Sequence, residues 1–125
     1  MDSGAVFSII AFCNSEMIGH GSLHFREFGA TKHVGRFRIV VMPEFRNKRL
    51  GTWILLDLIQ AAMDKGLETL RTDLVRGIED AAIEAVKKFD FFQRAELQNY
   101  AVGPDGGTHD MVIMVKRLHS TWTDF

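Results

Sequence analysis

Three cations lie close together between an apolar strand and the start of a helix. The apolar run Val40-Val41-Met42 ends at Pro43, a short loop containing Arg46, Lys48 and Arg49 follows, and Gly51 opens the helix. Backbone N–H groups at a helix start, the positive end of its dipole and nearby basic side chains together form a site for an anion. Cations at this end oppose the dipole when no anion is bound. The pattern therefore predicts a phosphate-binding loop, with a solvated basic turn as the alternative.

A second group of residues could move protons. Glu27 and the histidines at 20, 24 and 33 fall in or near one predicted strand, where a carboxylate or imidazole could remove a proton from an amine. Tyr100 is the only tyrosine and could act as a general acid. The alternative for these residues is ordinary polar or half-buried strand positions. The histidine spacings of four and nine do not form a three-ligand set on one strand face, so we expect no metal site.

The bulk composition limits the function classes. The chain has 125 residues, a net charge of −1 and 25% charged residues, so it has no basic field for nucleic acid. Its apolar runs are too short to span a bilayer, and its N-terminus lacks the regions of a signal peptide. The single Cys13 excludes an intrachain disulfide. We expect a cytoplasmic protein that binds neither nucleic acid nor membrane.

The hydrophobic periodicity predicts eight elements in one domain over residues 1–125. The first three strands form an antiparallel meander, and the strand–helix–strand unit that follows is a parallel, right-handed crossover. Gly19 and Gly21 indicate a bulge or a close neighbour, and the apolar run Ile39–Met42 indicates a strand covered on both faces. The order is β-β-β-α-β-α-β-β, which is an α/β or α+β fold with a mixed sheet. The expected strands span 5–13, 17–28, 34–42, 67–75, 96–102 and 109–118, and the helices span 50–65 and 80–89.

Three segments resemble the GCN5-related N-acetyltransferase (GNAT) superfamily. They are the strand and loop ending in Arg46-x-x-x-x-Gly51, the helix Asp80–Phe91, and the pair Glu96–Tyr100 and His109–Met114. The resemblance implies a mixed, mostly antiparallel sheet with helices on both faces, acetyl-CoA as co-substrate and an amine acceptor. It also implies that the pantetheine arm pairs with the strand edge and the pyrophosphate lies at the loop. The cofactor-binding residues expected on this basis are Val40, Val41, Arg46, Asn47, Lys48, Arg49, Leu50, Gly51 and Thr52.

The departures from the family pattern leave two function classes. Arg49 and Asp90 stand where the family has glycines, and Val86 stands where many members have a tyrosine acid. Arg36 and Arg38 occupy the strand where a glutamate base is common. The family's first strand and helices do not precede the meander, so we expect an uncovered sheet edge and a homodimer. The chain is either an N-acyltransferase that works by direct attack, or an inactive GNAT-fold module that binds CoA or a protein partner.

Overall fold

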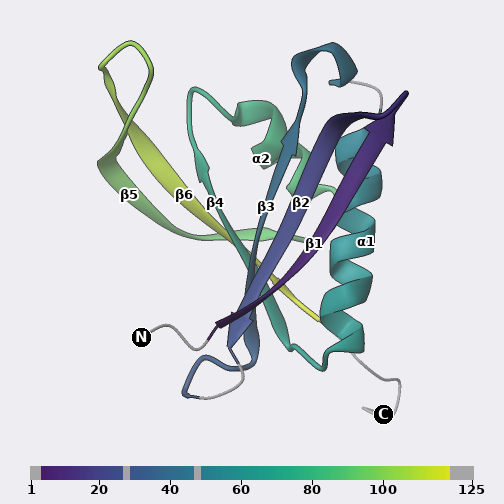
Figure 1. The fold of residues 1–125 in the computed structure, drawn as a ribbon. Helices are drawn as coiled ribbons and strands as arrows, with labels where there is room; N and C mark the ends of the chain where they lie inside the picture. The colour runs from purple at the N-terminus through teal and green to yellow at the C-terminus, as the bar shows by residue number, and fades with distance from the viewer. Residues whose placement is uncertain (1–3, 27–28, 47–48, 119–125) are drawn as a thin grey trace. The chain divides into compact units, whose positions relative to one another are not determined.

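The computed structural model describes residues 4–26, 29–46 and 49–118 (Figure 1). These residues form two compact units, the first comprising the chain up to Leu70 together with Leu118, and the second comprising Arg71–Arg117. Within the described ranges, no helix has the length and apolar character needed to cross a membrane. The predicted order of elements is confirmed. The bounds are β1 (Gly4–Cys13), β2 (Glu16–Arg26), β3 (Val34–Val41), a 3₁₀ turn (Pro43–Phe45), α1 (Leu50–Asp64), β4 (Thr69–Val75), α2 (Asp80–Lys87), β5 (Phe92–Val102) and β6 (Thr108–Arg117).

The first unit contains the predicted antiparallel meander. β2 pairs antiparallel with β1 on one side and with β3 on the other. Asn14 and Ser15, which connect β1 to β2, both have positive φ, at 52° and 72°. Positive φ at both central residues is the geometry of a tight hairpin turn whose twist matches that of the flanking strands. The turn between the first two expected strands therefore comprises Asn14 and Ser15, and β2 begins at Glu16, one residue before the expected start.

Helix α1 covers one face of this meander, as Figure 1 shows for the teal helix beside the purple and blue strands. Its buried residues follow the helical period predicted from the sequence. Gly66 has a φ of 77° and closes the helix, since its N–H donates to Met63 and the next N–H donates to Ala62. The Nζ of Lys65 lies 5.2 Å from the centre of the Phe7 ring and 5.1 Å from the centre of the Phe25 ring, within the range of cation–π contacts. The core of this unit comprises Leu23, Phe37, Ile54, Leu55, Leu58, Ala61, Ala62, Leu67, Leu70 and Leu118.

Strand β4 begins in the first unit and continues into the second. The N–H groups of Glu68 and Thr69 both donate to the carbonyl of His33, so β3 and β4 start at the same end and run parallel. The Leu118 N–H donates to the Glu68 carbonyl, which places the end of β6 beside the start of β4. The Arg76 N–H donates to the Asp110 carbonyl, which places the end of β4 beside the start of β6. The two strands therefore pair antiparallel. The strand order is β1-β2-β3-β4-β6-β5. This is the expected mixed, mostly antiparallel sheet.

The second unit combines α2 with the hairpin of β5 and β6. The buried side chains of α2 are Ile83 and Val86, as its period predicts. The turn between the last two expected strands is closed by Gly103 N–H donating to Gly107 and Gly106 N–H donating to Gly103. The other large side chains buried in this unit are Leu74, Phe91, Val112 and Met114.

Two expectations about strands are wrong. β5 begins at Phe92 and not near Glu96, because Phe92 and Gln93 pair with Val115 and Met114 although this stretch is exposed and partly polar. The run Ile39–Met42 is not covered on both faces, since Val40 is 52% exposed and Met42 is 42% exposed. Its apolar side chains alternate between the α1-facing side and the open side of the meander.

Candidate functional site

The loop after β3 is fastened to the strand that precedes it. Pro43 starts a 3₁₀ turn whose N–H donors at Phe45 and Arg46 bond back to Met42 and Pro43. The Arg46 side chain then folds back, and its Nε donates to the Val41 carbonyl over 3.2 Å. The guanidinium has five N–H donors, so this bond leaves its other donors for a further acceptor. One of the predicted loop cations is thus held at the carboxyl end of β3.

Arg49 is the N-cap of α1 and adopts a left-handed backbone, with φ 66° and ψ 7°. Its carbonyl accepts the first helical hydrogen bond, from the N–H of Trp53 over 3.0 Å. Among the residues that the structure describes, the Arg49 side chain makes no capping hydrogen bond to the helix, and the first turn contains no acidic residue. The left-handed geometry explains why a glycine suits this position in the family pattern: glycine adopts it without a Cβ penalty.

We therefore expect Arg49→Gly to stabilise the free protein. A non-glycine residue in this region costs about 1–2 kcal/mol, and the gain should be about 1 kcal/mol after the added freedom of glycine in the unfolded chain. Urea unfolding of the two proteins measures the difference. Asp90→Gly is the matched comparison, because Asp90 has a φ of 67° and aspartate tolerates this region better than arginine. A gain no greater at Arg49 than at Asp90 would contradict this account.

Gly51 lies in the first turn of α1 with room beside its Cα. Among the described residues beyond its chain neighbours and its own helix, a Cβ added there would meet Val41 Cγ2, at 3.8 Å, which is ordinary contact. Leu50 packs towards Gly19 of β2, and Thr52 is half-buried in the same turn. The packing of the protein itself therefore does not require a glycine at residue 51. Of the predicted loop residues, Asn47 and Lys48 lie outside the described residues.

The predicted catalytic residues come from separate places in the chain. His33 is exposed in the turn before β3, and its carbonyl holds the start of β4. Tyr100 is 65% exposed on β5, directly after a bulge at Asn99, whose φ is 53°. Glu27 lies outside the described residues. Val86, at the position of the family's tyrosine, is buried in the second unit and carries no proton to donate.

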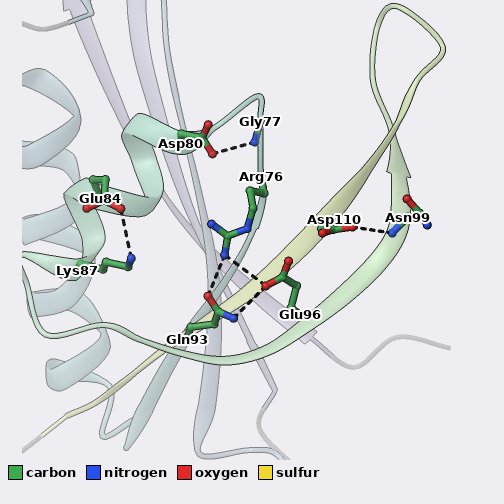
Figure 2. A network of polar contacts seen from close by, with 9 residues as sticks. All are labelled: Arg76, Gly77, Asp80, Glu84, Lys87, Gln93, Glu96, Asn99 and Asp110. Carbon is green, nitrogen blue, oxygen red and sulfur yellow. Dashed lines mark hydrogen bonds and ion pairs between the residues drawn. The ribbon is translucent and has the colours of Figure 1, made fainter.

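A polar network in the second unit was not anticipated from the sequence (Figure 2). Arg76 Nη2 donates to Gln93 over 3.0 Å and to Glu96 over 3.4 Å, and Gln93 also donates to Glu96. Asp110 accepts the N–H of Asn99 over 2.9 Å at the bulge of β5. The members come from β5, β6 and the end of β4, so no sequence spacing relates them. Pairing of the strands alone brings them together.

This network lowers the pKa of Asp110. The largest cause is the hydrogen bond from the Asn99 N–H, followed by the neighbouring Glu96 side chain, with the charge of Arg76 also contributing. A carboxylate whose pKa is lowered on folding stabilises the protein above its unfolded pKa. That stabilisation is lost as the pH falls through the folded pKa.

We expect Asp110→Asn to remove this acid-dependent contribution. The variant should be less stable than the wild type at neutral pH, and the difference in unfolding free energy should shrink as the pH falls below about 4, the usual pKa of aspartate. Urea unfolding across this pH range measures it. Asp57→Asn, which changes an exposed carboxylate on α1, is the control for the loss of a surface carboxylate. An Asp110→Asn difference that stays constant with pH would be evidence against the linkage.

The model of the Acetyltransferase (GNAT) family matches residues 2–91. The match covers more than half of the chain, so the chain belongs to the GNAT acetyltransferase family. No protein of curated function matches it in sequence. The described residues contain no group of three or more metal-ligating side chains.

Solved structures of this family share the fold. The ribosomal-protein-S18-alanine N-acetyltransferase of Escherichia coli has a TM-score of 0.81 at 20% identity, over 96% of this chain and 74% of that one. A GNAT-family acetyltransferase of Streptococcus pneumoniae has a TM-score of 0.82 at 22% identity, over 89% and 66%. The protein yncA of Salmonella typhimurium, whose structure contains its cofactor acetyl-CoA, has a TM-score of 0.81 at 20% identity, over 93% and 66%.

Proposed function

We propose that this protein transfers an acetyl group from acetyl-CoA to an amine. The observation that carries the proposal is the start of α1, where a first turn without an acidic residue, an anchored Arg46 and the small Gly51 combine the features of a pyrophosphate site. The family match and a relative whose structure contains acetyl-CoA support the choice of ligand. The cytoplasm suits the exposed thiol of Cys13, because thiols stay reduced there.

In the proposed site the pyrophosphate binds residues 46–52, and the pantetheine arm follows the end of β3 at Val40 and Val41. The loop cations neutralise the phosphates, and the first-turn N–H groups donate to their oxygens. If the Arg49 side chain also reaches a phosphate, Arg49→Gly would weaken binding while stabilising the free protein. The two effects of that one variant are measured separately.

The proposed chemistry is direct attack. The amine nitrogen attacks the thioester carbonyl carbon, an N–C bond forms, the C–S bond breaks, and the sulfur leaves with the bonding electron pair. A strand N–H stabilises the oxyanion, and the nitrogen loses its proton to Glu27, His33 or water. Holding both substrates together supplies much of the rate acceleration. A dedicated acid is therefore not required.

Tyr100→Phe should lower kcat less than tenfold. A thiol has a pKa of about 8.5, so a thiolate can leave without full protonation. Where a general acid does operate, it contributes about 10²–10⁴-fold. The measurement is steady-state kinetics of the wild type and the variant, with an amine acceptor that a panel of amines identifies. A hundredfold loss, with acetyl-CoA affinity and melting temperature intact, would identify Tyr100 as the acid.

Two measurements test the proposal. Calorimetry with acetyl-CoA tests binding, and the fluorescence of Trp53, one turn after Arg49 and 67% exposed, reports on the same end of α1 in a Trp122→Phe background. A panel of amines with detection of the released thiol then tests transfer. Binding without transfer to any amine would favour the second candidate, an inactive GNAT-fold module. The observation that supports that candidate is the buried Val86, because valine cannot donate a proton as the family's tyrosine would. No binding at all would overturn the proposed function.

A further inference from the structure

Trp53 is a large aromatic side chain that lies in solvent beside the proposed phosphate site. It is 67% exposed, whereas tryptophan usually buries most of its surface and contributes most where it packs against another group. Its N–H donates to the carbonyl of Arg49, the N-cap of α1, over 3.0 Å, so it lies one turn into the helix. An aromatic surface is therefore present within one helical turn of the loop cations.

Trp53 lies on the side of α1 that faces away from the meander. The opposite side packs on the strands, since Ile54 is buried and would lie 3.1 Å from a Cβ on Gly19 of β2. Leu56 and Gln60, three and seven residues after Trp53, are exposed and form one stripe with it. Helical side chains lean towards the N-terminus of their helix, so the indole covers the outer side of the first turn.

The charges near Trp53 suit an uncharged ring better than a phosphate. Arg46 and Arg49 precede the helix, whereas the first charged residue within α1 is Asp57, one turn after Trp53 and exposed. A phosphate placed on the indole would approach this carboxylate and leave the cations. Adenine is uncharged, offers a flat face to the indole, and has an amino group that can donate to a carboxylate.

We propose that Trp53 stacks on the adenine ring of acetyl-CoA, an inference that rests on the proposed function for the position of the pyrophosphate. In acetyl-CoA the pyrophosphate joins the pantetheine arm to an adenosine. The proposed arm follows the end of β3, which the inner side of α1 approaches at Gly51. The adenosine leaves the pyrophosphate on the other side, where the indole lies. One ribose separates the base from the phosphates, and one helical turn, about 5.4 Å, separates Trp53 from the N-cap.

Two ligands and one substitution test the stacking by calorimetry. The ligands are acetyl-CoA and S-acetyl-phosphopantetheine, which retains the thioester, the arm and one phosphate but has no adenosine. Trp53→Ala should weaken acetyl-CoA binding by about 5- to 150-fold, the effect of removing one base-stacking aromatic side chain. It should leave the affinity for S-acetyl-phosphopantetheine unchanged. Trp53→Phe should recover part of the loss, because phenylalanine keeps a smaller aromatic face.

Leu56→Ala is the matched control for the substitution. Leu56 is 45% exposed on the same stripe of α1, one turn further from the phosphate site, and has no aromatic face. Its replacement by alanine should leave the affinity for both ligands nearly unchanged. A loss of acetyl-CoA affinity in this variant as large as in Trp53→Ala would mean that the apolar stripe, and not the indole, sets the effect.

Fluorescence gives a readout that a purely structural role of Trp53 would not produce. The chain has two tryptophans, so Trp122→Phe leaves Trp53 as the single emitting indole. Acetyl-CoA should quench this emission through contact of the stacked rings, whereas saturating S-acetyl-phosphopantetheine should quench it much less. Equal quenching by the two ligands would contradict the stacking.

The outcomes separate this inference from the proposed function. Binding of acetyl-CoA to the wild type tests the proposed function, and the difference between the two ligands tests the role of Trp53. Equal acetyl-CoA affinity of the wild type and Trp53→Ala would overturn the stacking and leave the proposed function standing; the exposed indole would then serve another partner. An equal loss for both ligands would also overturn the stacking, since Trp53 would then support the start of α1 itself. A wild type that does not bind acetyl-CoA would overturn both.

Discussion

Replacing Gly51 with glutamate should abolish acetyl-CoA binding while leaving the fold intact. The added carboxylate would project from the first turn of α1, where the proposed site receives the pyrophosphate. Two like charges about 4 Å apart repel by about 4 kcal/mol at an effective dielectric near 20, or roughly a thousandfold in affinity. The glutamate would also fill the space that lets phosphate oxygens approach the backbone N–H groups.

The same substitution should not weaken the free protein. An acidic side chain in the first turn of a helix interacts favourably with the dipole, typically by about 0.3–1 kcal/mol, and the first turn of α1 has none. The melting temperature of Gly51→Glu without ligand should therefore equal or exceed that of the wild type. A loss of binding could then not be attributed to unfolding.

Thermal shift with saturating acetyl-CoA measures this prediction. The wild type should gain stability with ligand, since a ligand that binds only the folded state raises the melting temperature, and Gly51→Glu should gain none. Gly51→Ala is the control, because its Cβ makes ordinary contact with Val41 and carries no charge. It should keep most of the ligand-induced shift. An equal shift in the wild type and the glutamate variant would show that the phosphates do not bind at residue 51.

The candidate phosphate loop could be proposed from the sequence because its residues are continuous in the chain. Its cations, Gly51 and the proline that ends the strand fall within ten residues, so their order alone indicates an anion site. The backbone geometry at Arg49 was not predictable, since a positive φ at an arginine is set by how the loop enters α1. The family pattern contained the signal, because a glycine at that position indicates a left-handed residue.

Features that depend on strand pairing were harder to predict. The helical period predicted α1 and α2 correctly, with their ends within two residues of the expected bounds. The start of β5 was missed because Gln93 and Arg94 are polar, whereas in the structure β5 pairs with β6 from Phe92 onwards, with an irregularity between Gln93 and Ala95. The Arg76–Asp110 network was missed for the same reason. Arg76 and Asp110 are 34 positions apart in the sequence, and only the pairing of the strands brings them into one network.

The sequence also indicated a close neighbour at two glycines of β2, and the structure identifies it as α1. A Cβ built on Gly21 would lie 2.4 Å from Cγ2 of Ile54 and 3.1 Å from Cδ1 of Leu58. The first distance is far below any real contact of a Cβ, and Cγ2 is the branched methyl fixed to the Cβ of Ile54. It cannot rotate away as the end of a long side chain could, so the helix or the strand would have to shift.

Gly21→Ala should consequently destabilise the protein by about 1–3 kcal/mol, the usual cost of inserting a methyl group into a packed core. Gly51→Ala adds the same atom at ordinary contact distance, so it should cost far less. Urea unfolding of the two variants makes the comparison. A similar loss in both would mean that the alanine side chain itself, and not the approach of α1, sets the cost.

A second substitution identifies the responsible atom. Ile54→Leu keeps the side-chain volume but moves the branch away from the Cβ, so it removes the methyl that a Cβ at residue 21 would meet. In the Gly21→Ala background it should restore part of the lost stability, whereas alone it should cost less than about 1.5 kcal/mol as a volume-conserving change. The double-mutant cycle then gives a favourable coupling energy between residues 21 and 54. Strictly additive effects would show that β2 and α1 do not meet at this pair, and that the close approach of the helix to Gly21 is not what makes this glycine necessary.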